Sequence, residues 1–156
     1  LVMPILTCNS QIWSPYLGYR INQLEAVQRR FLRYLSFKSG SPMAWVDHDY
    51  SLISRRFCVR TIKSIHEISD MVLVYKLMNG LIFSLPFEGE FCIKSVPYGF
   101  RQTDKLIERK RDSDNLRFST FSRLTKNWNA LSANIKSLPT VFTFKRTIKQ
   151  TLENYY

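Results

Sequence analysis

The chain has 156 residues, of which 45% are hydrophobic and 14% aromatic, and this composition excludes an intrinsically disordered protein. No apolar run approaches the roughly 18 residues that a membrane span requires, so no membrane-embedded segment is expected. The formal net charge of +11 favours a polyanionic partner such as nucleic acid over the alternative, a basic surface that only keeps the protein soluble.

The segment Leu1–Tyr16 has the spacing of a helix that carries an apolar stripe. Pro4 suits a first helical turn, and the Ser14-Pro15 step predicts the end of the helix because proline disfavours helical backbone in the residue before it. The chain opens without Met and already inside this pattern, which suggests a fragment. The stripe consists of Val2, Ile5, Leu6, Ile12, Trp13 and Tyr16.

A second amphipathic helix is predicted over Ile21–Leu35. At about 100° per residue, its apolar and basic positions fall on opposite faces. The apolar face consists of Leu24, Val27, Phe31 and Leu35, and the basic face of Arg29, Arg30 and Arg33.

The middle of the chain predicts a short helix over Asp47–Phe57, which Asp47 or Asp49 would cap. A longer helix is predicted from Thr61, as its N-cap, to Asn79, with Gly80 in the left-handed position that closes a helix. This helix is apolar around most of its circumference, which is typical of a central, buried element. His66 within it is expected to be a structural histidine.

The remainder alternates between irregular and helical patterns. The segment 81–100 contains Pro and Gly and predicts a connector, and 101–117 is a polar loop or, alternatively, an arm that orders on a polyanion. Helices are expected over Phe118–Leu131 and over Thr140–Asn154, with Thr140 as the second N-cap. Basic residues Lys145, Arg146 and Lys149 share a face beside the last apolar stripe.

Together these elements predict a mainly α protein, a helical bundle of about five helices with a loop-rich middle and a basic connector. The expected regions are 1–80, a thumb-like helical part, 81–117, the connector, and 118–156, a helical tail packed on the same core. Positive charge is concentrated late in the sequence: residues 94–156 hold thirteen Lys/Arg and five Asp/Glu.

Metal and cofactor chemistry find little support. The His and Cys residues show none of the paired spacings that zinc sites use, and no Gly-rich phosphate loop or nucleophile motif is present, so no metal or cofactor is expected. A Cys/His nucleophile assembled only in three dimensions stays open as an alternative. Three widely spaced cysteines fit a reducing compartment, so an intracellular protein of nucleus or cytoplasm is expected.

Three sequence blocks resemble the region that follows the palm in reverse transcriptases of non-LTR, LINE-like (jockey-type) retrotransposons. The first is the pair of amphipathic segments up to Leu35, and the second is Arg55-Arg56 with the later run VYKLMNG, residues 74–80. The third is RLTKNWNAL, residues 123–131, followed by Ser137 and Thr143-Phe144-Lys145. Here Ser132 stands where many members of that family have Pro.

The resemblance implies the C-terminal thumb and tail of an RNA-directed DNA polymerase, as a fragment that lacks the catalytic palm. Its partners would be template RNA or RNA–DNA hybrid and the upstream palm of the same polyprotein. The palm's metal-binding aspartates include an adjacent pair, and this sequence has no adjacent Asp pair, so the chain alone is not expected to polymerise.

Candidate nucleic-acid contacts are therefore basic side chains on helical faces, because guanidinium and ammonium groups bind phosphate without reading sequence. Tyr34, Phe121 and Trp128 are alternatives for base stacking, although their spacing favours packing in the core. Two other functions stay open: a standalone basic helical module that binds an acidic protein, and a decayed retroelement relic with no separate activity. The candidate contact residues are Arg29, Arg30, Arg33, Lys126, Lys145, Arg146 and Lys149.

Overall fold

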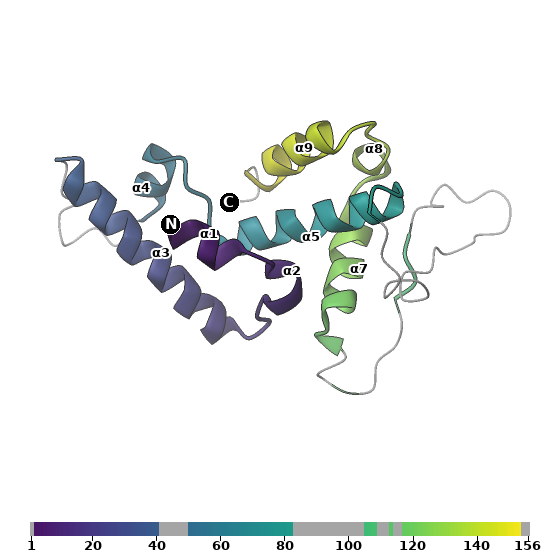
Figure 1. Cartoon of the computed structure of the whole chain (residues 1–156), viewed down its shortest axis with the longest axis horizontal. Helices are drawn as coiled ribbons and strands as arrows, with labels where there is room; N and C mark the ends of the chain where they lie inside the picture. Colours follow the sequence, from purple (N-terminus) through teal and green to yellow (C-terminus); the bar gives the residue numbers. More distant parts are fainter. Residues whose placement is uncertain (1, 41–49, 83–104, 109–112, 114–116, 154–156) are drawn as a thin grey trace, which may run out of the picture. The chain divides into compact units, whose positions relative to one another are not determined.

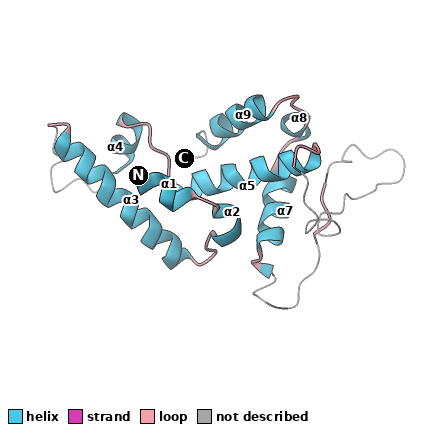
Figure 2. Cartoon of the chain, in the orientation of Figure 1, coloured by secondary structure: helices cyan, strands magenta, loops and turns pink. Residues whose placement is uncertain are grey.

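The computed structural model describes residues 2–40, 50–82, 105–108, 113 and 117–153 (Figure 1). Of these residues 73% are helical and none forms a strand, which confirms the predicted mainly α class (Figure 2). Five of the described helices have seven or more residues, in agreement with the expected number. No helix in the described ranges is long and apolar enough to cross a membrane.

The chain forms two compact units, residues 1–66 and residues 67–156, which we call the N-terminal unit and the C-terminal unit. Their boundary falls inside helix α5 (Ile62–Met78). The three-region division expected from the sequence stays a prediction, because most of the connector 81–117 lies outside the described residues. Within 101–117, the expected polar loop or arm, the described part 105–108 includes Leu106, which is buried in the core of the C-terminal unit.

The first sixteen residues form two short helices instead of the one helix expected. Helices α1 (Val2–Thr7) and α2 (Ser10–Trp13) are separated at Asn9, whose φ of 51° lies in the left-handed region that Asn tolerates better than most residues. The Trp13 indole N–H donates to the Cys8 carbonyl at 2.6 Å and so stabilises this break. Helix α2 ends at Trp13, where the following Ser-Pro step was predicted to end it.

His66 ties these two short helices to the beginning of α5. Its Nε2 lies 2.9 Å from the Leu6 carbonyl oxygen, and its Nδ1 lies 2.9 Å from the Ser14 hydroxyl. A carbonyl oxygen only accepts, so Nε2 carries a proton, and in the neutral ring Nδ1 accepts from the Ser14 hydroxyl. The Trp13 ring packs edge-on against the imidazole, with 5.1 Å between centroids. His66 is buried, as expected of a structural histidine.

Helix α3 (Gly18–Lys38) is longer than the predicted Ile21–Leu35, and it buries a different face. Its buried residues are Gln28, Leu32 and Ser36. Leu24, Phe31 and Leu35 of the predicted apolar face are half-buried, whereas Val27 is 42% exposed, so only its place on that face is wrong.

Two polar contacts account for the difference between the predicted and the observed buried face of α3. The Gln28 amide donates to the Arg60 carbonyl, which lies 32 residues later in the chain. The Glu25 carboxylate accepts from the backbone N–H of Lys63, one of the amides in the first turn of α5 that has no partner within its own helix. These bonds turn a polar side of α3 toward the interior of the N-terminal unit.

Helix α4 (Tyr50–Arg56) contacts α3 and lies within the predicted Asp47–Phe57. The proposed capping residues Asp47 and Asp49 lie outside the described residues. Helix α5 agrees closely with its prediction: the Thr61 hydroxyl accepts from the Ser64 N–H at 3.2 Å and caps its start.

The end of α5 is closed by Gly80 at a φ of 65°. The Leu81 N–H donates to the Lys76 carbonyl at 2.8 Å and the Gly80 N–H to the Leu77 carbonyl at 3.1 Å. This pair of bonds is the Schellman pattern, which confirms the predicted role of Gly80.

The C-terminal unit contains α7 (Thr120–Ala130), the short α8 (Ala133–Lys136) and α9 (Val141–Glu153), packed with the later part of α5 around an apolar core. Tyr75 and Phe144 stack with centroids 4.3 Å apart, and the Tyr75 hydroxyl donates to the Leu138 carbonyl. The core residues are Ile68, Met71, Val74, Tyr75, Leu106, Leu124, Trp128, Phe144 and Ile148.

Both helices of the predicted tail are confirmed, together with Thr140, the cap predicted for the second of them. The Thr140 hydroxyl accepts from the Thr143 N–H at 3.2 Å at the start of α9. Ser132 precedes the first residue of α8 with extended backbone. The buried Asp70 carboxylate of α5 accepts from the Arg123 Nε of α7 at 2.8 Å.

Candidate nucleic-acid interface

Two of the three predicted arginines of α3 meet a tyrosine from α4. The guanidinium carbons of Arg29 and Arg33 lie 6.0 Å and 5.8 Å from the centroid of the Tyr50 ring, and Arg33 also donates to the Tyr50 hydroxyl. Cation–π contacts of this length are attractive. Tyr50 therefore holds two guanidinium groups next to each other on the outside of the N-terminal unit.

The third arginine, Arg30, belongs to a more exposed strip of the same helix. Tyr34 follows it by four residues and Phe37 by seven, so the three side chains lie along one face. Arg30 is exposed, and Tyr34 and Phe37 have exposed fractions of 56% and 72%. We call Arg29, Arg30, Arg33, Tyr34 and Phe37 the α3 surface.

The arginines of the α3 surface have no carboxylate partner among the residues that the structure describes. Residues 1–66 contain nine Lys/Arg and three Asp/Glu, a formal charge of +6. One of the three acids, Glu25, accepts a bond from the backbone of Lys63, and the other two lie outside the described residues.

The remaining predicted contacts lie in the C-terminal unit. Lys126 is exposed on α7, between the buried residues Leu124 and Trp128 of the neighbouring turns. On α9, Lys145 and Arg146 are exposed and Lys149 is half-buried. Lys149 follows Lys145 by four residues and Arg146 by three, so it neighbours both of them on the surface of the helix.

The structure thus brings Arg29 and Arg33 together around a shared ring, with Arg30 on the adjoining surface. It places Lys126, Lys145, Arg146 and Lys149 in the other unit, and a continuous cationic track remains a prediction. Of the aromatic candidates, Trp128 is buried in the core and Tyr34 is exposed.

Sequence reasoning missed Tyr50 and Phe37 as members of this region. Tyr50 lies 17 residues after Arg33, so no local pattern connects the two side chains. Phe37 follows the predicted end of its helix, and only the longer α3 places it on the same face as Arg30.

The described parts of the chain contain no cluster of metal ligands, that is, no group of three or more His, Cys, Asp or Glu side chains that could hold a metal ion. Comparisons with known protein families, with curated proteins and with solved structures found no match to this chain.

Proposed function

We propose that this chain is a non-catalytic nucleic-acid-binding module that grips an RNA template or an RNA–DNA hybrid through phosphate contacts. The observation that carries the proposal is the α3 surface, where guanidinium groups without carboxylate partners in the described structure alternate with exposed aromatic rings. Basic side chains interleaved with aromatic ones are the recurring means of holding a polynucleotide.

Each part of this surface has a distinct task in the proposal. Arg30 and Arg33 offer paired N–H donors that match phosphate oxygens. Tyr50 restricts the side chains of Arg29 and Arg33 before the ligand arrives, which lowers the entropy lost on binding. Tyr34 is exposed enough to stack on an unpaired base.

The wider setting of the proposal comes from the sequence resemblance. The parent protein would be an intracellular retrotransposon reverse transcriptase, in which the upstream palm performs RNA-directed DNA synthesis and this region holds the template. Lys126, Lys145, Arg146 and Lys149 would add further phosphate contacts from the C-terminal unit.

The test is a salt series of binding to an RNA–DNA hybrid, measured by fluorescence anisotropy. About six phosphate contacts predict a log–log slope near −5. Arg30→Glu is the sharpest variant, because Arg30 is exposed and does not contact the Tyr50 ring in the structure. We expect weaker binding and a slope that is smaller by about one.

Arg20→Glu is the matched control, since it reverses one exposed arginine charge of the same helix outside the α3 surface. Equal loss of affinity in both variants, or a salt-independent wild type, would reject the assigned surface. Tyr34→Ala adds a second comparison: stacking predicts that it weakens single-stranded RNA binding more than hybrid binding.

A protein partner is the second candidate function, and a specific observation favours it. Ile5 and Ile12 of the two short N-terminal helices are both exposed, Ile12 to 78%, and exposed apolar groups of this kind often mark protein contacts. Binding to an acidic protein that persists in Arg30→Glu but is lost in a variant carrying Ile5→Ser and Ile12→Ser would favour this function over nucleic-acid binding.

A further inference from the structure

A cavity of about 280 Å³ opens in the C-terminal unit between the end of α7, the short helix α8 and the segment at Lys105. This volume is close to the lower limit of about 300 Å³ for small-molecule pockets. The cavity is lined by Lys105, Asn129, Ala130, Leu131, Ser132, Ala133 and Lys136.

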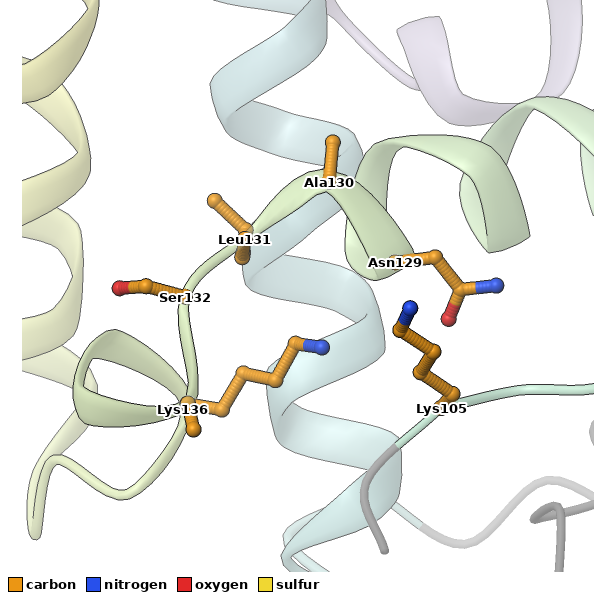
Figure 3. A pocket seen from close by; sticks show the side chains of 7 residues that line it. Lys105, Asn129, Ala130, Leu131, Ser132 and Lys136 are labelled. Atoms are coloured by element: carbon orange, nitrogen blue, oxygen red, sulfur yellow. The ribbon is translucent and has the colours of Figure 1, made fainter. Parts of the chain in front are cut away.

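Two ammonium groups reach into this space from different elements. Figure 3 shows the side chains of Lys105 and Lys136 extending from opposite sides toward the region below Asn129. The Ser132 side chain points away from it. Neither lysine was among the residues that the sequence pattern selected.

The position of Lys105 is set by the next residue, Leu106, whose side chain is buried. Asn129 accepts from the Leu106 N–H and donates to the Leu106 carbonyl, both at 2.9 Å, so its amide pairs with this backbone as another peptide group would. The Leu106 side chain is part of the hydrophobic core. The backbone beside Lys105 is therefore fixed at both its polar groups and its side chain.

Lys136 is positioned by a buried aromatic ring. Its Nζ lies 5.4 Å from the centroid of Trp128, a core residue of α7, and a cation–π contact restrains the ammonium at the edge of the cavity. Two cationic side chains from different elements therefore line one concave site, and a phosphate bound between them would be attracted to both.

We propose that this cavity binds a phosphate group of a nucleotide, with Lys105 and Lys136 on the phosphate oxygens and the Asn129 end of α7 beside the attached sugar. Phosphate is favoured over a carboxylate because the volume accommodates more than a small carboxylate and because two point charges suit a doubly charged group. This site is separate from the α3 surface, and its existence does not depend on the function proposed for that surface.

Among the described residues beside the cavity, Glu108 works against anion binding. The exposed Glu108 carboxylate accepts from the Asn129 side-chain amide at 3.3 Å. Its negative charge would repel a phosphate, so removing that charge should strengthen binding. This opposite effect gives the proposal a variant that gains affinity.

The experiment is a titration of the whole chain followed by NMR at the Asn129 side-chain amide and the Trp128 indole N–H. The probes are inorganic phosphate, a nucleoside 5′-monophosphate, and one short oligonucleotide with either a 5′-phosphate or a 5′-hydroxyl end. Shifts caused only by the phosphorylated probes assign a phosphate monoester as ligand. Equal shifts with the hydroxyl-ended oligonucleotide assign a backbone phosphate. Either result supports the cavity as a phosphate site.

Variants decide whether the lysines hold the phosphate. We expect the combination of Lys105→Gln and Lys136→Gln to weaken binding roughly a hundredfold, about tenfold for each lost charge-assisted bond. The combination of Lys38→Gln and Lys63→Gln removes two exposed lysines of the N-terminal unit and should leave binding unchanged. Glu108→Gln should tighten it severalfold. The proposal is overturned if no phosphate probe moves these signals, or if both lysine pairs have the same effect.

Discussion

The interiors of the two units differ in the side chains that they bury. Among its described residues, the C-terminal unit buries nine hydrophobic residues in one core, including a stacked Tyr75–Phe144 pair. The buried hydrophobic residues in the described part of the N-terminal unit are Leu32, Ile53 and Ile62, and buried polar residues are as prominent there. Among the described residues of that unit these polar ones are Ser10, Gln28, Ser36, Ser64 and His66.

Burial of apolar surface contributes most of the free energy of folding, whereas each internal hydrogen bond contributes only about 0.5–1.5 kcal/mol. We therefore expect the C-terminal unit to resist local opening better than the N-terminal unit. The N-terminal unit also presents most of the large exposed hydrophobic residues of the described chain.

The strongest test of this comparison is Phe144→Ala in the C-terminal unit. Phe144 is 0% exposed and stacks on Tyr75, so its truncation leaves a cavity and should lower the free energy of unfolding by about 3–5 kcal/mol. Urea denaturation followed by circular dichroism measures the loss. Phe142→Ala, on the same helix but 75% exposed, should change it by less than about 0.5 kcal/mol. A similar cost for both variants would contradict the assigned core.

An intermediate effect is expected from His66→Leu in the N-terminal unit. The substitution removes the bonds to the Leu6 carbonyl and the Ser14 hydroxyl, which together should cost about 1–3 kcal/mol. Hydrogen exchange measured by mass spectrometry should rise in peptides that cover α1 and α2, with little change in α9. His66→Gln, which keeps a donor and an acceptor, should recover part of the protection. Faster exchange in α9 of the same size would show that the two units do not open independently.

The smallest effects are expected at two glycines that differ in backbone conformation. Gly80 has a φ of 65°, so Gly80→Ala should destabilise the protein by about 1 kcal/mol although no atom obstructs the new methyl group. Gly18, the first residue of α3, lacks a positive φ and also has open space around it. Gly18→Ala should stabilise by about 0.4–1 kcal/mol, because it reduces the freedom of the unfolded chain. Thermal unfolding of both variants checks the opposite signs.

The parts of the fold that the sequence predicted correctly depend on local chemistry. Thr61, Thr140 and Gly80 act within one turn of their own helices, and short-range caps leave a readable pattern. The sequence also places Val141, Phe144, Ile148 and Leu152 on one apolar stripe of α9, and the structure buries Phe144 and Ile148 and half-buries the other two.

The parts that the sequence did not predict depend on contacts between distant residues. The buried face of α3 is set by Gln28 and Arg60, and the position of Arg33 by Tyr50. The break at Asn9 depends on a left-handed backbone that Asn permits but does not require. For the candidate interface, helical spacing alone located the three arginines, whereas their aromatic neighbours required the observed length of α3 and the placement of α4.

The pairing of Asn129 with Leu106 has a consequence for how an extended segment is held in a helical protein. A neighbouring strand would offer a row of further unpaired groups, and such open edges invite association with other chains. The carboxamide of Asn129 pairs with the N–H and the carbonyl of one residue, Leu106. Unlike the edge of a strand, it presents no row of further backbone groups with which another chain could pair. An aspartate in place of Asn129 could still accept from the Leu106 N–H, but it would lose the bond to the Leu106 carbonyl and would place a negative charge beside that oxygen.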